Sequence, residues 1–170
     1  GWKLTFQDEF DEQKLDKKKW RTDHCFGLRY NPESIIKENK SPKQYCGDNM
    51  FEFTNSTIKQ KADKNPIKIN YTDCNGVDYG SYTIPYRVGH LDSSKSFIQK
   101  YGYFEIRSKM TSQPGHWPAF WMVSIDSHFP EIDIYEAYTS KSIKGLVSFK
   151  SNFHWGTSEN KAMKVMGHNV

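Results

Sequence analysis

The chain has 170 residues, which is long enough for one domain with a hydrophobic core. Its 24 basic and 20 acidic residues give a net charge of only +4, and the lysines are spread along the sequence, so we expect no nucleic-acid partner. No stretch approaches the roughly 18 apolar residues of a membrane-spanning helix. No linker rich in Pro, Gly or Ser divides the sequence, and we predict a single domain over residues 1–170.

Short runs of β-branched and aromatic residues alternate with turn-forming residues along the whole chain. Turn signals such as Asn65-Pro66 and Gln113-Pro-Gly115 recur at the spacing of an all-β sandwich. Only residues 11–19 and 159–166 have a composition that suits a helix. We therefore predict an all-β fold, a sandwich of two antiparallel sheets. Its predicted strands are residues 2–6, 51–53, 57–61, 67–71, 97–109, 119–123, 132–138 and 145–153.

The three cysteines, Cys25, Cys46 and Cys74, show neither C-x-x-C spacing nor neighbouring histidine pairs, so we expect no zinc site. Cys25 and Cys46 could close a disulfide loop, and a fully reduced set fits the sequence equally well. The chain starts at Gly1 instead of Met, so an export signal would no longer be visible.

Three carboxylates lie within six residues of an otherwise apolar, β-prone run that starts at Glu131. On a plain strand Glu131 and Asp133 share a face, because side chains alternate. Glu136 lies five positions after Glu131, and this odd separation would turn it toward the core at a cost of several kcal/mol. A β-bulge between Asp133 and Glu136 would return it to the face of the other acids.

Such a row of acids suits the hydrolysis of glycosidic bonds, which needs one carboxylic acid and one carboxylate on either side of a sugar ring. If Asp133 shares a proton or hydrogen bond with Glu131, the local negative charge keeps Glu136 protonated near neutral pH. The alternative is a surface strand with a solvated acidic face. The flanking aromatic residues and the required bulge favour an active site.

Aromatic residues make up 15% of the chain and gather just before the acidic strand. Trp117 and Trp121 are our candidates for platforms on which the apolar face of a sugar ring packs. Phe120 and Trp121 point to opposite faces of one strand, so one of the two belongs to the core. His154 follows the strand expected beside the acids and is a further candidate for substrate binding.

The segment Glu131-Ile-Asp-Ile-Tyr-Glu136 resembles the bulged E-x-D-x-x-E signature of glycoside hydrolase family 16, which includes laminarinases, agarases and carrageenases. Other segments resemble family motifs in the same order, and four ordered motifs are more specific than one. They are Trp2-Lys-Leu-Thr-Phe-Gln-Asp-Glu-Phe-Asp11 with Leu15, Asp16 and Trp20, then Tyr101-Gly-Tyr-Phe-Glu-Ile-Arg-Ser-Lys109, and Gly115-His-Trp-Pro-Ala-Phe-Trp121.

The resemblance implies a concave β-jelly-roll that cleaves internal glycosidic bonds with retention. Glu131 would be the nucleophile, Glu136 the general acid/base and Asp133 the assisting carboxylate. It implies no cofactor for catalysis and is compatible with a structural calcium ion. In Tyr86-Arg-Val-Gly-His-Leu-Asp-Ser93, His90 stands where many members place Arg, and we expect Arg87 and His90 to contact substrate.

For substrate we expect a laminarin-type β-1,3-glucan first, then mixed-linkage glucan, then an agar or carrageenan galactan. A lectin-like carbohydrate-binding sandwich without hydrolysis is the alternative function. The resemblance runs from residue 2 to about residue 155, so we expect a C-terminally incomplete domain with a second fragment or chain completing the sandwich. We expect a secreted, cell-surface or periplasmic protein.

Overall fold

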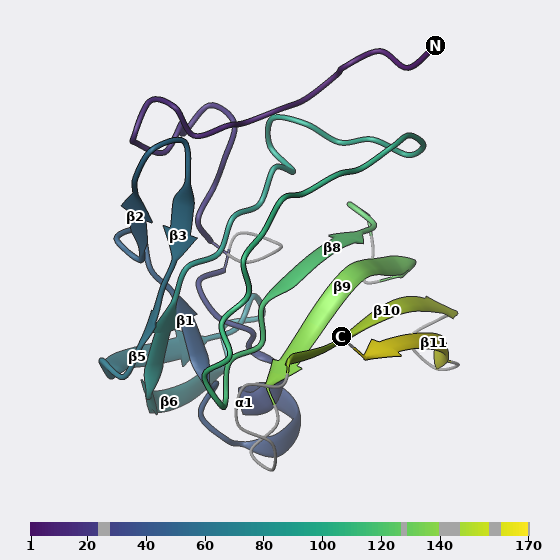
Figure 1. Cartoon of the computed structure of the whole chain (residues 1–170). Coiled ribbons are helices and arrows are strands. Elements are labelled where there is room, and N and C mark those ends of the chain that lie inside the picture. Colours follow the sequence, from purple (N-terminus) through teal and green to yellow (C-terminus); the bar gives the residue numbers. More distant parts are fainter. Residues whose placement is uncertain (24–27, 127–128, 140–146, 157–160, 170) are drawn as a thin grey trace. The chain divides into compact units, whose positions relative to one another are not determined.

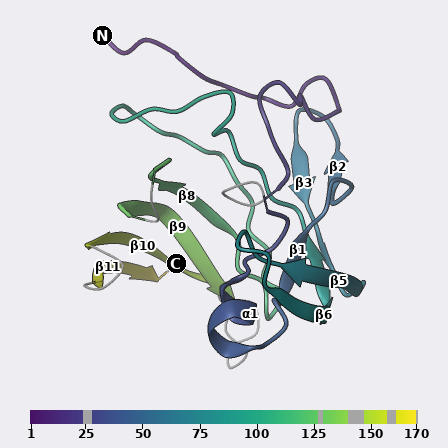
Figure 2. The ribbon, with the colours of Figure 1, turned by 180° about the vertical axis from the view of Figure 1, so that it is seen from behind.

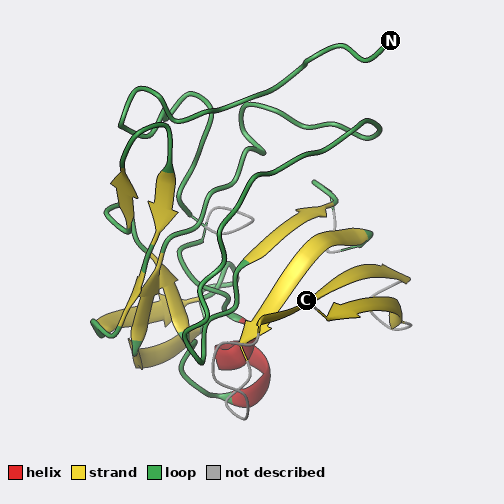
Figure 3. Ribbon diagram, viewed as in Figure 1, coloured by secondary structure: helices red, strands yellow, loops and turns green. Residues whose placement is uncertain are grey.

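The computed structural model describes residues 1–23, 28–126, 129–139, 147–156 and 161–169. Nearly all the regular structure in these residues is β-strand, and the helix among them is α1 (Glu33–Glu38) (Figure 3). Most of the strand pairs are antiparallel. The predicted all-β class is therefore confirmed, and it agrees with a β-jelly-roll sandwich. The chain forms two compact units, Gly1–Gly102 and Tyr103–Val170.

The first unit contains three small sheets. In one of them β7 lies between β1, to which it is parallel, and β4, to which it is antiparallel. The other two sheets are the antiparallel pairs β2–β3 and β5–β6. The strands are β1 (Gln44–Cys46), β2 (Phe51–Phe53), β3 (Ile58–Gln60), β4 (Ala62–Asp63), β5 (Ile67–Thr72), β6 (Asp78–Ile84) and β7 (Tyr86–Val88).

A tight turn joins the two longest strands of this unit, β5 and β6. Between β5 and β6, Asp73 accepts hydrogen bonds from the backbone N–H groups of Asn75 and Val77. Gly76 has a φ of 81°, a conformation that a residue without Cβ adopts at little cost. The core of the unit lies around Ile35 and Ile84, whose side chains are 1% and 0% exposed.

The second unit contains one antiparallel sheet in the order β11-β10-β9-β8. Its four strands lie side by side in both views of the chain (Figure 1 and Figure 2). Because the two central strands are paired on both edges, their backbone hydrogen bonds are satisfied within the sheet. The strands are β8 (Ala119–Val123), β9 (Glu131–Thr139), β10 (Val147–Gly156) and β11 (Lys161–Asn169).

Two predicted strands and two candidate helices are wrong. Residues 11–19 form turns instead of a helix, and residues 161–169, predicted in part as helix, form strand β11. β11 pairs with β10 at nine positions from Gly156 to Ser148, and this cross-strand pairing overrides local helix propensity. Residues 2–6 and 97–109 are not strands, although their composition suits strands. Their backbone groups lack the ladder of cross-strand hydrogen bonds that defines a strand.

Two further findings bear on the sequence predictions. The described residues include no helix with the length and apolar character needed to cross a bilayer. Cys46 is buried in β1 and Cys74 is exposed, whereas Cys25 lies outside the described residues, so the state of the cysteines stays open.

Candidate active site

The three acids lie on β9, and the register of the neighbouring strands shows a bulge among them. On β10, Asn152 pairs with Asp133 and Lys150 pairs with Glu136, so two steps along β10 match three steps along β9. β8 shifts its register against the same part of β9. The predicted bulge between Asp133 and Glu136 is therefore confirmed.

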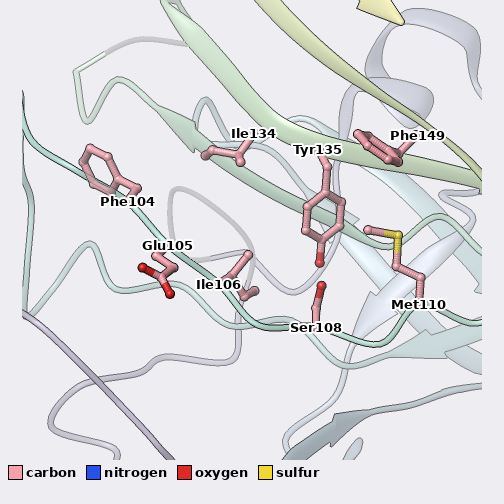
Figure 4. A pocket seen from close by; sticks show the side chains of 8 residues that line it. All are labelled: Phe104, Glu105, Ile106, Ser108, Met110, Ile134, Tyr135 and Phe149. Atoms are coloured by element: carbon pink, nitrogen blue, oxygen red, sulfur yellow. The ribbon is translucent and has the colours of Figure 1, made fainter. Parts of the chain in front are cut away.

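The two residues of the bulge face away from the acids. Ile134 and Tyr135 point into a hollow of about 400 Å³, and the Tyr135 hydroxyl points toward Ser108 (Figure 4). One strand thus presents acids on one face and apolar groups on the other, which is what the inserted residue achieves. This hollow is lined by Phe104, Glu105, Ile106, Ser108, Met110, Ile134, Tyr135 and Phe149.

Three donors from different parts of the unit hold the carboxylate of Glu136. Trp117 donates from Nε1 to Oε1 over 3.0 Å. The other oxygen, Oε2, accepts from the Tyr138 hydroxyl over 3.1 Å and from Nδ2 of Asn152 over 2.5 Å. The side chain therefore has one fixed orientation, on the face opposite the bulge residues.

Asp133 is the buried member of the three acids, with 3% of its surface exposed. Its Oδ2 accepts a hydrogen bond from Nδ2 of Asn152 over 3.0 Å and lies 3.2 Å from Nε2 of His154. The same nitrogen of His154 lies 3.9 Å from Oε1 of Glu131. Asn152 and His154 therefore connect all three acids into one polar cluster.

A second hollow, of about 290 Å³, opens over this cluster. The indole of Trp117 is 57% exposed, and its ring lies 4.9 Å from that of Tyr138. Nζ of Lys150 lies 5.7 Å from the Tyr138 ring. Exposed rings beside fixed carboxylates can receive a sugar, whose C–H groups pack on rings while its hydroxyls need polar partners. The lining residues are Trp117, Glu131, Glu136, Tyr138, Lys150, Asn152 and His154.

Burial raises the pKa of Glu136 above its usual range, and the charge on Asp133 raises it further. The hydrogen bonds from Tyr138 and Trp117 act in the opposite direction, because they favour the ionised carboxylate. A raised pKa of Glu136 is what the sequence predicted, although burial raises it more than the charge on Asp133 does. Burial and the neighbouring Glu136 also raise the pKa of Tyr138 to about 12, so this phenol remains a donor at neutral pH.

The other predicted substrate-binding residues divide between the units. Trp121 pairs with Asp133 and so shares the face of the acids, whereas Phe120 pairs with Tyr135 on the other face. Arg87 and His90 belong to the first unit, where Nε of Arg87 donates to the carbonyl of Asn65. Contact of Trp121, Arg87 and His90 with substrate stays a prediction.

Sequence reasoning missed three residues of the site, Tyr138, Lys150 and Asn152. Their signal was the same alternation that revealed the acids, because Tyr138 lies two positions after Glu136. Asn152 likewise lies two positions before His154 on the next strand, and Lys150 two positions before Asn152.

The described part of the chain contains one group of side chains that could hold a metal ion. It consists of Glu131, Asp133 and His154, whose possible ligand atoms lie within 4.8 Å of one another. Calcium prefers a shell of six to eight oxygen atoms, so a cluster containing an imidazole does not fit the structural calcium ion. The location of such an ion stays a prediction.

Glu131 and Glu136 lie on one face of β9 near the exposed Trp117, and this arrangement is compatible with the paired carboxyl groups that hydrolysis of a glycosidic bond requires. The fold and the site thus agree with the class of glycoside hydrolases. The chain belongs to the glycosyl hydrolases family 16, whose family model matches residues 46–169.

Three similar proteins match most of this chain, and in each of them the matched region is only part of the full length. The endo-1,3-1,4-beta-glycanase ExsH of Rhizobium meliloti is 31% identical over 158 residues, which are 87% of this chain and 32% of that protein. The glucan endo-1,3-beta-glucosidase A1 of Niallia circulans is 27% identical over 88% of this chain and 22% of its own length. The Gram-negative bacteria-binding protein 3 of Drosophila melanogaster is 28% identical over 70% of this chain and 27% of its own length.

The chain therefore spans about a third or less of the length of these relatives. No solved structure gives a significant match.

Proposed function

We propose that this chain carries the catalytic site of a retaining endo-β-glucanase that works by double displacement. The observation that carries the proposal is the bulge in β9, which aligns Glu131, Asp133 and Glu136 on one face. A strand with a merely solvated acidic face would need neither the bulge nor a nearly buried Asp133. This argues against the alternative of a solvated surface strand.

In the first step a carboxylate oxygen of Glu131 attacks the anomeric carbon, and the bond to the leaving oxygen breaks. Glu136 gives its proton to that oxygen, so the shorter sugar chain leaves as an alcohol. In the second step Glu136, now ionised, takes a proton from water, and the hydroxide displaces Glu131 from the sugar. The enzyme is restored and the configuration at the anomeric carbon is retained.

Support for the division of roles comes from the surroundings of the two glutamates. The raised pKa of Glu136 suits the residue that must begin the cycle protonated. Glu131 lies on the same face, with Nε2 of His154 3.9 Å from its Oε1. Asp133 makes no step of its own and orients the cluster.

The proposed substrate is a β-1,3-glucan of the laminarin type or a mixed β-1,3-1,4-glucan. The names of the bacterial relatives, an endo-1,3-1,4-beta-glycanase and a glucan endo-1,3-beta-glucosidase, support these two linkages. An agar or carrageenan galactan ranks behind them. We further propose that the protein acts outside the cytoplasm, because such polymers are too large to cross a membrane unaided.

The substrate is tested by incubating the protein with laminarin, lichenan, agarose and carrageenan and measuring new reducing ends. We expect activity on laminarin or lichenan and oligosaccharide products from internal cleavage. Proton NMR of the first products should show the β-anomer, because double displacement retains configuration. Activity confined to a galactan would refute the glucan assignment, and initial formation of the α-anomer would refute the mechanism.

Glu131→Gln should lower kcat by at least about 10³-fold while ligand binding persists, because it removes the nucleophile and leaves the aromatic wall intact. Asp133→Asn should cost less than loss of either glutamate, because Asp133 only orients and tunes. Calorimetric titration with a laminari-oligosaccharide measures binding in the same variants. Turnover that survives in Glu131→Gln would remove this residue from the mechanism.

A carbohydrate-binding protein without hydrolysis is the second candidate, and one observation favours it. The Drosophila relative is named as a bacteria-binding protein instead of an enzyme. Such a protein would keep an exposed Trp117 but would not need Glu131 and Glu136 together. Binding of laminarin without reducing ends, over pH 4–8 and long incubation, would decide for this candidate.

A further inference from the structure

One amide joins two of the three acids. Nδ2 of Asn152 lies 3.0 Å from Oδ2 of Asp133 and 2.5 Å from Oε2 of Glu136. Asn152 is 6% exposed and Asp133 3%, so water gives little competition for these bonds. An asparagine amide carries two N–H groups, and here each carboxylate takes one of them.

The bulge explains how a single side chain reaches both acids. Asn152 lies directly opposite Asp133, whereas Glu136 pairs with Lys150, one place further along the same face. Because the bulge places Ile134 and Tyr135 on the other face, Glu136 becomes the next residue after Asp133 on this face. As a result, Nδ2 of Asn152 lies within hydrogen-bond distance of both Asp133 and Glu136.

The chemistry of an amide suits this position. A lysine or arginine here would add a positive charge and favour the ionised form of both acids, which would hinder Glu136 as an acid. An apolar residue would leave two carboxylates close together and undersolvated. Asparagine donates to both and adds no charge, so the repulsion between Asp133 and Glu136 still acts on the proton of Glu136.

We infer that Asn152 is a positioning residue that holds the assisting acid and the general acid/base at a fixed separation through its one amide group. This inference rests on the proposed hydrolase function. When the amide is lost, Asp133 keeps a partner in His154, and Glu136 keeps Trp117 and Tyr138. Glu136 loses the shorter of the two amide bonds, so its ionisation is the property that reports the loss.

The test is the ionisation of Glu136 in the full chain, followed by NMR of ¹³C-labelled glutamate and assigned with Glu136→Gln. Asn152→Ala should raise the pKa of Glu136, because a donor to the ionised form is removed. Asn152→Asp keeps the size, loses the donor and adds a carboxyl group, so it should raise this pKa further. The charged and titratable groups that face Glu136 in all variants are Asp133, Glu131 and Tyr138 on β9, and Lys150 and His154 on β10.

On a β-glucan that the wild type cleaves, Asn152→Ala should lower kcat about 10- to 100-fold, which is part of the 10²- to 10⁴-fold effect of general acid–base catalysis. The alkaline limb of its pH–rate profile should move to higher pH together with the NMR titration. Tyr138→Phe removes one donor to Glu136 without reaching Asp133, so it should shift the same limb with a smaller loss of kcat.

Ser148→Ala is the matched control, because Ser148 lies on the same strand and its hydroxyl makes a long bond, of 3.4 Å, to the carbonyl of Tyr138. It should leave kcat and the titration of Glu136 unchanged. A lower melting temperature in Asn152→Ala with an unshifted Glu136 titration would show a merely structural role and overturn the inference. If the wild type cleaves no glucan, the proposed function fails, while the NMR titration still decides whether Asn152 controls Glu136.

Discussion

Glu136 experiences two opposing influences on its proton. Burial and the charge on Asp133 favour the neutral acid, while the N–H of Trp117 and the hydroxyl of Tyr138 favour the carboxylate. A general acid/base needs both forms in one cycle, since it gives a proton in the first step and takes one in the second. Single donors around Glu136 are therefore the places where the pH range of activity can be adjusted.

Trp117→Phe separates the two proposed contributions of this tryptophan. The variant keeps an aromatic ring for sugar packing and loses the Nε1–H that donates to Glu136 over 3.0 Å. Loss of this donor raises the pKa of Glu136, so the alkaline limb of the kcat/KM profile should move to higher pH. A stopped assay across pH 4–9 measures the limb, and Trp117→Ala should in addition raise KM. An unmoved limb in Trp117→Phe would contradict the assignment of Glu136 as the acid.

Asp23 gives a residue-level prediction about stability. The hydrogen bond from Arg21 lowers the pKa of Asp23 to about 2, compared with 3.8 for an unperturbed Asp. A depressed carboxyl pKa stabilises the fold above pH 3.8, and this contribution is lost as the pH falls through about 2. Asp23→Asn should be less stable than the wild type at pH 6, by about 1 kcal/mol, since the two side chains, 13% and 20% exposed, still meet solvent. In urea unfolding the two proteins should converge at pH 2, and a constant difference across pH would exclude this linkage.

At the scale of elements, the bulge in β9 is stabilised by a contact from the neighbouring strand β10. Ser151 lies between the two register positions on β10, and its hydroxyl donates to the carbonyl of Ile134 over 2.8 Å. Bulges leave a backbone group outside the regular ladder, and this hydroxyl supplies the missing partner.

Ser151→Ala should therefore destabilise the protein by about 0.5–1.5 kcal/mol, the usual net value of one hydrogen bond. Urea unfolding followed by intrinsic tryptophan fluorescence measures the change. Ser151→Thr keeps the hydroxyl on a strand-forming residue and should stay close to the wild type. Equal stability of all three proteins would mean that the carbonyl of Ile134 is satisfied in another way.

The bulge could be predicted because one face of the strand had to carry all three acids, and the odd spacing of Glu131 and Glu136 left no other solution. Strand β11 could not be predicted, because the Lys-rich segment becomes a strand only by pairing with β10. Residues 97–109 show the converse, since strand-forming composition without a ladder gave no strand. Asn152 was missed because its place opposite Asp133 depends on the register of β10 against β9, which only the pairing of the two strands sets.

At the scale of the whole molecule, the organisation of residues 1–170 as a single domain stays a prediction. Among the described residues, the large side chains with under 2% exposure are Ile35, Pro42 and Ile84, all in the first unit. A domain of about 60 residues buries only about 60% of the surface that its unfolded chain exposes, so a unit as short as Tyr103–Val170 is marginal on its own. The expected companion chain likewise stays a prediction, which intact-mass analysis would test.

We therefore expect one cooperative unfolding transition in scanning calorimetry, with equal calorimetric and van't Hoff enthalpies. A laminari-oligosaccharide that binds the native site should raise the melting temperature, by mass action. Two separate transitions, of which only one responds to the sugar, would show that the two units are independent domains.

The acids and their hydrogen-bonding partners on β9 and β10 lie close together in the sequence, and this closeness affects how the site can be inherited. Glu131, Asp133, Glu136, Asn152 and His154 all lie within residues 131–154, so a single short stretch of the gene encodes them. A recombination event with both breakpoints outside this stretch transfers the complete set. The exposed Trp117 lies upstream of this stretch. A crossover between residues 117 and 131 would therefore replace this tryptophan, while the acids and their hydrogen-bonding partners would be inherited together.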